Sequence, residues 1–240
     1  MSSAGLEALL AVQALDTAAD QLRHRRETLP ERAELAARQA AIADLEARAA
    51  AVRAERDTIA AAERRLEDEI AMVASKAKAA DQKLYSGTVN VPRELTALQD
   101  EIDSLHRRQR QLEDQELELM EQAEPLEAAL AELDAQRAAL DEQVAALLAA
   151  RTEAEAAIDA ELARVEAERA AAAAPVPGEL LREYEGLRHA LGGIGVARLA
   201  GNRCDGCHLT LSAVDVDRIR HEPPEAVVHC TECGRLLVRG

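Results

Sequence analysis

The sequence predicts a mainly α protein: a long antiparallel coiled-coil hairpin followed by a small, β-containing C-terminal zinc ribbon with four cysteine ligands. Three observations lead to this fold class: a heptad repeat of leucines, two helical segments of nearly equal length on either side of a turn, and four cysteines in two Cys-x-x-Cys pairs. The 240 residues include no Trp, no Phe and only two Tyr, so aromatic rings cannot fill the core of an ordinary globular domain.

The first helical segment, residues 4–84, has apolar residues at heptad spacing with one change of phase. Leu15, Leu22 and Leu29 form one series, and a second series, out of phase with it, follows. Pro30 lies at the discontinuity and cannot donate a helical hydrogen bond, so we expect a kink or short break at residues 28–31. The later series consists of Leu45, Val52, Ile59, Leu66 and Val73.

The second helical segment, residues 92–173, has a leucine every seven residues from Leu98 to Leu147. A repeat this long predicts supercoiling against another helix. Some companion positions are polar, including Gln109, Glu116 and Arg137, and such residues set the register of a coiled coil at some cost in stability.

Residues 85–94 form the predicted tip between the two segments, because Gly87 and Asn90 tolerate turn conformations and Pro92 suits the first turn of a helix. We therefore expect a hairpin over residues 1–174 and a linker helix with the ribbon over residues 175–240. A parallel dimer of one continuous helix is disfavoured by Gly87 and Pro92. Dimerisation of the hairpin stays open.

The four cysteines Cys204, Cys207, Cys230 and Cys233 are the predicted ligands of one structural zinc ion. Each Cys-x-x-Cys loop turns tightly enough to place two thiolates on one metal, and Gly206 and Gly234 are expected to supply the backbone freedom that these loops need. Two redox-active dithiols are the alternative. His208 and His229 lie beside ligand cysteines, and either could replace a thiolate. With four cysteines present, we expect both to be strand residues or hydrogen-bond donors to the ligands.

The rest of the C-terminal region is predicted to contain short elements around this site. Residues 179–191 have the pattern of a helix, and the apolar runs 196–199, 209–211, 227–228 and 236–238 have that of strands. Ser212 and Asp215 form a capping-box-like pair that opens a helical turn ending before Pro223.

Composition excludes several classes of function. The net charge is −16, of which residues 92–174 carry −13, so a nucleic-acid role would have to be local. The N-terminus lacks the pattern of a signal peptide, no run of 18 apolar residues occurs, and paired cysteines without an export signal indicate a cytoplasmic location. No catalytic constellation or phosphate-binding loop is apparent, and we expect a protein that is not an enzyme.

Three segments together resemble a widespread bacterial family of coiled-coil hairpin proteins with a C4-type zinc ribbon, which includes the flagellar regulator FlgZ. They are the tip from Leu84 to Ile102, the segment from Tyr184 to Ala197, and the closing knuckle from Cys230 to Leu237. The resemblance covers essentially the whole chain. It implies a zinc-binding protein, and in some members partners from flagellar or secretion systems, an alternative sigma factor or messenger RNA. Nothing in this sequence shows a flagellar context, so those partners do not transfer.

Three functional hypotheses follow. The first is a regulatory adaptor or scaffold that binds an unidentified protein through the tip residues Tyr85, Ser86, Asn90 and Arg93, although these residues could equally serve only to make the turn. The second is binding of RNA or DNA through the ribbon residues Arg198, Arg203, Arg235 and Arg239. The third, a factor that enters the RNA polymerase secondary channel, is disfavoured because the tip region is basic.

Overall fold

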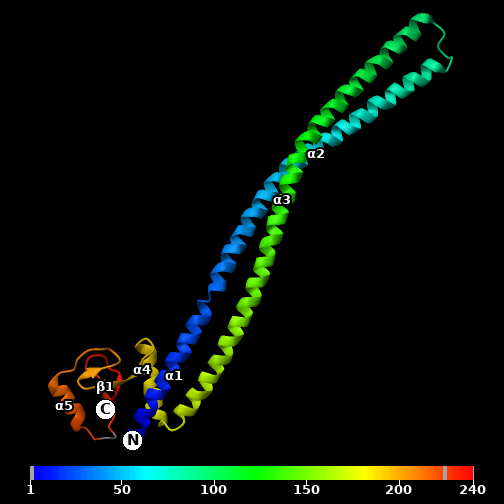
Figure 1. Ribbon diagram of the computed structural model, residues 1–240. Helices are drawn as coiled ribbons and strands as arrows, with labels where there is room; N and C mark the ends of the chain where they lie inside the picture. Colours follow the sequence, from blue (N-terminus) through cyan, green and yellow to red (C-terminus); the bar gives the residue numbers. More distant parts are fainter. Residues whose placement is uncertain (1–2, 224–225, 240) are drawn as a thin grey trace. The chain divides into compact units, whose positions relative to one another are not determined.

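The computed structural model describes residues 3–223 and 226–239 of the protein. Within these described residues there are five helices and four strands. Figure 1 shows their arrangement along the chain. They are α1 (Ser3–Glu27), α2 (Pro30–Tyr85), α3 (Pro92–Ala173), α4 (Gly178–Ala190), β1 (Val196–Ala200), β2 (Arg203–Cys204), α5 (Ala213–His221), β3 (Val228–His229) and β4 (Leu236–Arg239).

The chain divides into two compact units, which differ from the division at residues 174 and 175 expected from the sequence. One unit spans Glu34–Ala146, and the other combines Met1–Ala33 with Leu147–Gly240. We call the first the arm unit and the second the base unit. The division by sequence separates the helical hairpin from the ribbon, whereas the division by packing groups the ribbon with the first helix.

The arm unit is an antiparallel pair formed by most of α2 and the first part of α3. Cross-helix ion pairs show the direction: Glu46 pairs with Arg137 at 3.1 Å, and Arg56, further along α2, pairs with the earlier Glu127 at 2.8 Å. Leu45 and Leu133 are buried between the helices, as the heptad pattern predicts. The exposed ion pairs define the register of the two helices more than their stability, which comes from the apolar seam.

Two prolines mark irregular points along the helices. The predicted break near Pro30 is confirmed, because α1 ends at Glu27 and α2 begins at Pro30. Pro125 lies inside α3, a position that the heptad analysis did not single out. A proline inside a helix has no N–H to donate to the carbonyl four residues earlier.

The base unit contains a similar antiparallel pair, formed by α1 and the last part of α3. Leu22 and Leu29 pack with Ile158 and Val165 in one buried cluster. A second cluster joins α1, α4 and the sheet, so the ribbon shares a core with the first helix of the chain. Its buried members are Leu6, Leu9, Val12, Val176, Leu180, Tyr184, Val196, Leu236 and Val238.

The ribbon is a four-stranded sheet in the order β2-β1-β4-β3. The strand β1 pairs parallel with β4, while β2 and β3 pair antiparallel with β1 and β4. The expected strand at 209–211 is reduced to one bridge between Thr210 and Arg203. The predicted helix cap is confirmed: the Ser212 hydroxyl accepts a hydrogen bond from the Asp215 amide at 3.1 Å, and α5 ends before Pro223. Among the described residues, no helix is both long and apolar enough to cross a membrane.

Candidate zinc centre

Two loops of the same design present the cysteines. Cys204 ends β2, and Cys230 directly follows β3. In each loop the amide four residues after the first cysteine donates to its carbonyl at 2.8 Å: His208 to Cys204, and Gly234 to Cys230. Both of these closing residues have left-handed backbone conformations, with φ of 62° and 74°. One expectation from the sequence, that His208 is a strand residue, is therefore wrong. His208 closes the first loop.

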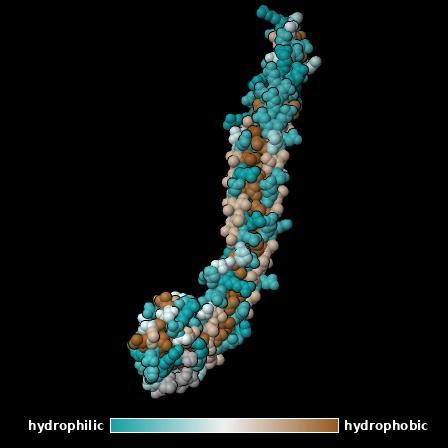
Figure 2. All heavy atoms as spheres, turned by 60° about the vertical axis from the view of Figure 1, so that its left-hand side comes forward, coloured by the Kyte–Doolittle hydropathy of each residue, from teal (hydrophilic) through white to brown (hydrophobic). Residues whose placement is uncertain are grey.

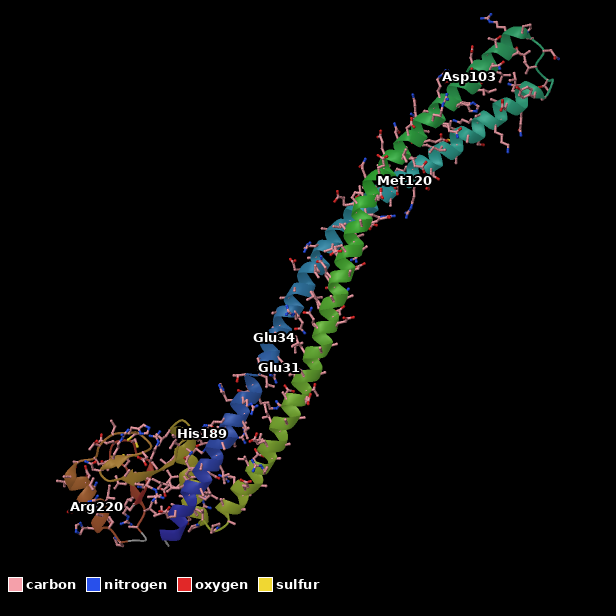
Figure 3. The ribbon with its side chains drawn as sticks, viewed as in Figure 1. Glu31, Glu34, Asp103, Met120, His189 and Arg220 are labelled. Carbon is pink, nitrogen blue, oxygen red and sulfur yellow. The ribbon has the colours of Figure 1, made fainter. Side chains whose placement is uncertain are left out.

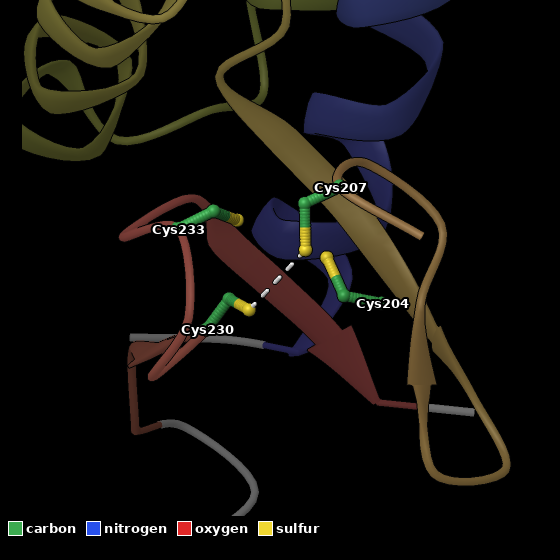
Figure 4. A group of neighbouring side chains, drawn as sticks. All are labelled: Cys204, Cys207, Cys230 and Cys233. Atoms are coloured by element: carbon green, nitrogen blue, oxygen red, sulfur yellow. Dashed lines mark hydrogen bonds between the residues drawn. The ribbon is translucent and has the colours of Figure 1, made fainter. Parts of the chain in front are cut away.

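The four sulfur atoms lie together at one point (Figure 4). All lie within 4.8 Å of one another, and the Sγ atoms of Cys207 and Cys230 are 3.9 Å apart. A tetrahedral zinc with Zn–S bonds of about 2.3 Å requires sulfur–sulfur distances of about 3.8 Å. The residues therefore fit a zinc ion, and the ribbon provides a C4-type site for one structural zinc. Two separate redox dithiols would not converge in this way.

The environment of the thiols makes zinc binding a proton-releasing step. Burial raises the pKa of Cys204, and burial raises the pKa of Cys230 to about 12. Burial also disfavours the Cys233 thiolate, but hydrogen bonds from the Arg235 backbone and side chain and from the Cys230 and Cys207 side chains together outweigh it and lower the pKa of Cys233 to about 7. Because zinc binds thiolates, metal binding must displace protons from the buried thiols.

Arg235 ties the second loop to the end of α4. Its Nε donates to the Ile194 carbonyl at 2.9 Å and its Nη2 to the Leu191 carbonyl at 3.0 Å. A Cβ on Gly206 would lie 2.7 Å from the Arg235 Cδ and 2.9 Å from the Ala197 Cβ. Gly206 is thus required for space and not, as expected from the sequence, for backbone freedom, since its φ is not positive. For Gly234 the expectation is confirmed.

The arginines expected to contact nucleic acid mostly have partners within the protein. Arg198 pairs with Glu7 of α1 at 2.8 Å, and Arg235 is held by the two carbonyls above. Arg239 donates to four backbone carbonyls between residues 219 and 226. Arg203 is exposed on β2. Three of the four side chains therefore have structural uses, and the nucleic-acid hypothesis stays a prediction.

The tip residues predicted to bind a partner fall into two groups. The Ser86 hydroxyl donates to the Lys83 carbonyl at 2.8 Å and lies 2.6 Å from the Thr88 hydroxyl, so Ser86 shapes the turn. Tyr85 is 81% exposed, and Asn90 and Arg93 are also exposed. Val91, which the sequence analysis did not select, is 52% exposed.

A buried polar network in the base unit was missed from the sequence. Asp16 of α1 is 8% exposed and accepts hydrogen bonds from the Tyr184 hydroxyl at 2.7 Å and from Arg169 at 3.2 Å. Burial, reinforced by Asp16, raises the pKa of Tyr184. Arg188 pairs with Asp16 and with Asp20. The network joins α1, α3 and α4.

Gln13 completes this connection by binding the segment that leads into β1. Its side chain donates to the Gly193 carbonyl and accepts from the Gly195 amide, both at 2.8 Å. A Cβ on Gly195 would lie 2.6 Å from the Tyr184 carbonyl, so this residue must be glycine for β1 to approach α4. Gln13 and Asp16 lie on the same helical face as Leu9 and Val12. Polar residues within an apolar stripe are a sequence signal of buried hydrogen bonds, and this signal could have identified the network.

Comparisons with known proteins agree with this geometry. The CT398-like coiled coil hairpin domain matches residues 12–192, and the C4-type zinc ribbon domain matches residues 203–237. Uncharacterized proteins of two Mycobacterium tuberculosis strains, CDC 1551 and H37Rv, are each 34% identical to this chain over 231 residues, which is 96% of this chain and 94% of theirs.

Three solved structures have similar folds. A Mycobacterium smegmatis protein has a TM-score of 0.89 and 26% identity, with coverage of 100% of this chain and 99% of its own. CT398 from Chlamydia trachomatis has a TM-score of 0.71 at 22% identity, covering 98% of both chains, and HP0958 from Helicobacter pylori has 0.54 at 16%, covering 99% and 98%. The last two show the fold alone. The chain belongs to the family of proteins that join a CT398-like coiled-coil hairpin domain to a C4-type zinc ribbon.

Proposed function

We propose that the protein is a non-enzymatic regulatory adaptor that binds a protein partner through the tip of the hairpin. The observation that carries this proposal is the exposure of Tyr85, at 81%, and of Val91, at 52%, where α2 ends and the turn leads into α3, with the exposed Arg93 in the first turn of α3. Tyr and Arg are favoured anchors of protein interfaces. Ser86 belongs to the turn and serves as support for these anchors.

The zinc centre supports a structural and not a catalytic role. Four thiolate ligands fill a tetrahedral zinc, so no position remains for water or substrate. The ribbon shares a core with α1 and α4, so a zinc ion that stabilises the ribbon also supports the packing of the base unit. A cytoplasmic location is part of this proposal, because reducing compartments keep cysteines from forming disulfides and so leave them able to bind zinc.

The test is affinity capture from the native host with a tip double variant, Tyr85→Ala with Arg93→Ala. We expect this variant to lose the main partner while its helical circular dichroism stays unchanged. The matched control is Met72→Ala with Arg107→Ala, which removes an exposed apolar and an exposed basic side chain from the arm. Capture that survives in the tip variant contradicts the proposal.

Binding of RNA or DNA through the ribbon is the alternative. If capture persists in the tip variant, is lost when residues 175–240 are removed, and is also abolished by nuclease, nucleic acid is the partner. Arg203 is then the first residue to replace, because it is exposed and the other three predicted arginines are held by carbonyls or by Glu7.

A further inference from the structure

A second surface with features of a binding site lies midway along the arm unit, where α3 faces α2. Leu117 and Met120 of α3 are 55% and 56% exposed, although the coiled-coil seam buries most of its own apolar residues. They line an open groove of about 490 Å³ with Ala123, Glu121, Glu124 and Glu127 of α3 and with Arg56 and Glu63 of α2. We call it the mid-arm groove. Met120 is labelled in Figure 3, and Figure 2 shows hydrophobic atoms reaching the surface along the arm between hydrophilic side chains.

The charged lining of the mid-arm groove consists of four glutamates and one arginine, Arg56, so the groove is acidic on balance. Residues 111–136 include nine Asp or Glu and no Lys, Arg or His. Glu127 is neutralised by Arg56 at 2.8 Å, whereas Glu63, Glu121 and Glu124 have no ion-pair partner among residues 3–223 and 226–239. Carboxylates without partners beside an apolar floor favour a ligand that brings both basic and apolar groups.

The backbone adds an acceptor at the same place. In an unbroken helix the Glu121 carbonyl would accept from the amide of residue 125, but residue 125 is proline and has no N–H. That carbonyl therefore lacks the donor that an unbroken helix would give it. It lies one turn from Leu117 and beside Met120, on the face formed by residues 117, 120, 121 and 124.

We propose that the mid-arm groove is a docking site for a basic amphipathic helix of a partner protein. The apolar side of that helix packs on Leu117 and Met120, and its flanking Lys or Arg residues pair with Glu121 and Glu124 and donate to the Glu121 carbonyl. Methionine suits such a surface because its flexible thioether adapts to the shape of a ligand. The site is separate from the tip and would give an adaptor a second contact.

The probe is a fluorescent synthetic peptide of about 18 residues made of Leu, Lys and Ala, with Leu at helical spacing on one face. Two control peptides are used. One has the same composition in scrambled order, and the other keeps the order but has Glu in place of every Lys. Binding to the full-length zinc protein is measured by fluorescence anisotropy at low and moderate salt.

Two groove variants are each compared with a control on α3: the apolar control replaces one exposed leucine, and the acidic control replaces two exposed glutamates. The apolar double variant, Leu117→Ser/Met120→Ser, is compared with Leu148→Ser. The acidic double variant, Glu121→Gln/Glu124→Gln, is compared with the double variant Glu142→Gln/Glu153→Gln, which removes the same charge elsewhere on α3. All of these side chains are exposed, so folding is kept, and thermal melting verifies it.

We expect each groove variant to raise the peptide Kd about tenfold, and each control variant to raise it less than about twofold. Pro125→Ala should raise Kd about threefold while it also raises the melting temperature, because the restored N–H occupies the Glu121 carbonyl. Equal weakening by groove and control variants would show a diffuse acidic field and overturn the proposal. Equal binding of the scrambled peptide, or tighter binding to Pro125→Ala, would overturn it as well.

Discussion

Replacing Tyr184 by Phe isolates one hydrogen bond of the network that joins the helices of the base unit. The ring is fully buried and Phe fills the same volume, so no cavity forms and only the hydroxyl is lost. That hydroxyl donates to Asp16 at 2.7 Å, and hydrogen bonds to charged groups contribute about 1.5–3 kcal/mol. Asp16 keeps its contact with Arg169 at 3.2 Å, so we expect a loss of about 2 kcal/mol at pH 7.

The pH dependence of this loss follows from the tyrosine itself. Burial, with the contribution of Asp16, raises the pKa of Tyr184 above its ordinary value of 10.0. The unfolded chain therefore releases the phenolic proton near that value while the folded protein retains it. This part of the stability is complete below pH 10 and falls above it by about 1.4 kcal/mol per pH unit. Tyr184→Phe lacks this dependence, so its difference from the wild type must shrink as the pH rises.

The assay uses the small number of aromatic residues in the chain. With Tyr85→Phe as background, Tyr184 is the sole tyrosine and no Trp is present, so tyrosinate absorbance reports this residue alone. We expect the absorbance to rise only together with the loss of helical circular dichroism. Tyr85→Phe by itself, at an exposed position, should change stability by less than about 0.5 kcal/mol in urea unfolding. Tyrosinate that forms in the folded protein, or equal stability of Tyr184→Phe and wild type at pH 7, would refute the reasoning.

Three further predictions concern the zinc and the cores. Metal analysis should find one zinc per chain, and a zinc content of two would contradict the single site. The Cys204→Ser variant should lose the zinc and unfold the ribbon while most of the helical circular dichroism remains. Gly206→Ala should weaken zinc binding in a competition assay with a chelator, because its Cβ would meet Arg235 and Ala197, whereas Gly178→Ala, with nothing within 4 Å, should not. Leu112→Ala, at 1% exposure, should destabilise the arm by about 2–5 kcal/mol in thermal or urea unfolding, and the exposed Leu148→Ala by far less.

Periodic and local features of the fold could be predicted from the sequence. The leucine heptads defined the hairpin because apolar side chains at a spacing of seven must face another helix to be buried. Pro30 and the residues around Gly87 marked the ends of helices because their backbone chemistry excludes regular hydrogen bonding there. The two Cys-x-x-Cys pairs defined the zinc site because a short loop fixes the position of both sulfur atoms.

Long-range contacts were decided only by the tertiary structure. Arg239 resembles a free basic residue in the sequence, yet it donates to four carbonyls from the end of α5 and the segment that follows it. Gly206 resembles a flexible turn residue, but its requirement comes from Arg235, which lies 29 positions away in the other loop. No local pattern contains such information, because the partners come from separate segments.

The base unit shows the same limit most fully. The sequence determined that α1 is a helix with an apolar face, but not that Gln13 and Asp16 on that face bind α4 and the segment before β1. Buried polar groups are stable only when a partner satisfies each of them, and their partners here lie more than 150 residues along the chain. The sequence by itself determined the helices, the turn and the metal ligands, each from neighbouring residues. Only the folded chain decided that the ribbon shares its core with the first helix, because burial of an apolar face depends on which surface meets it.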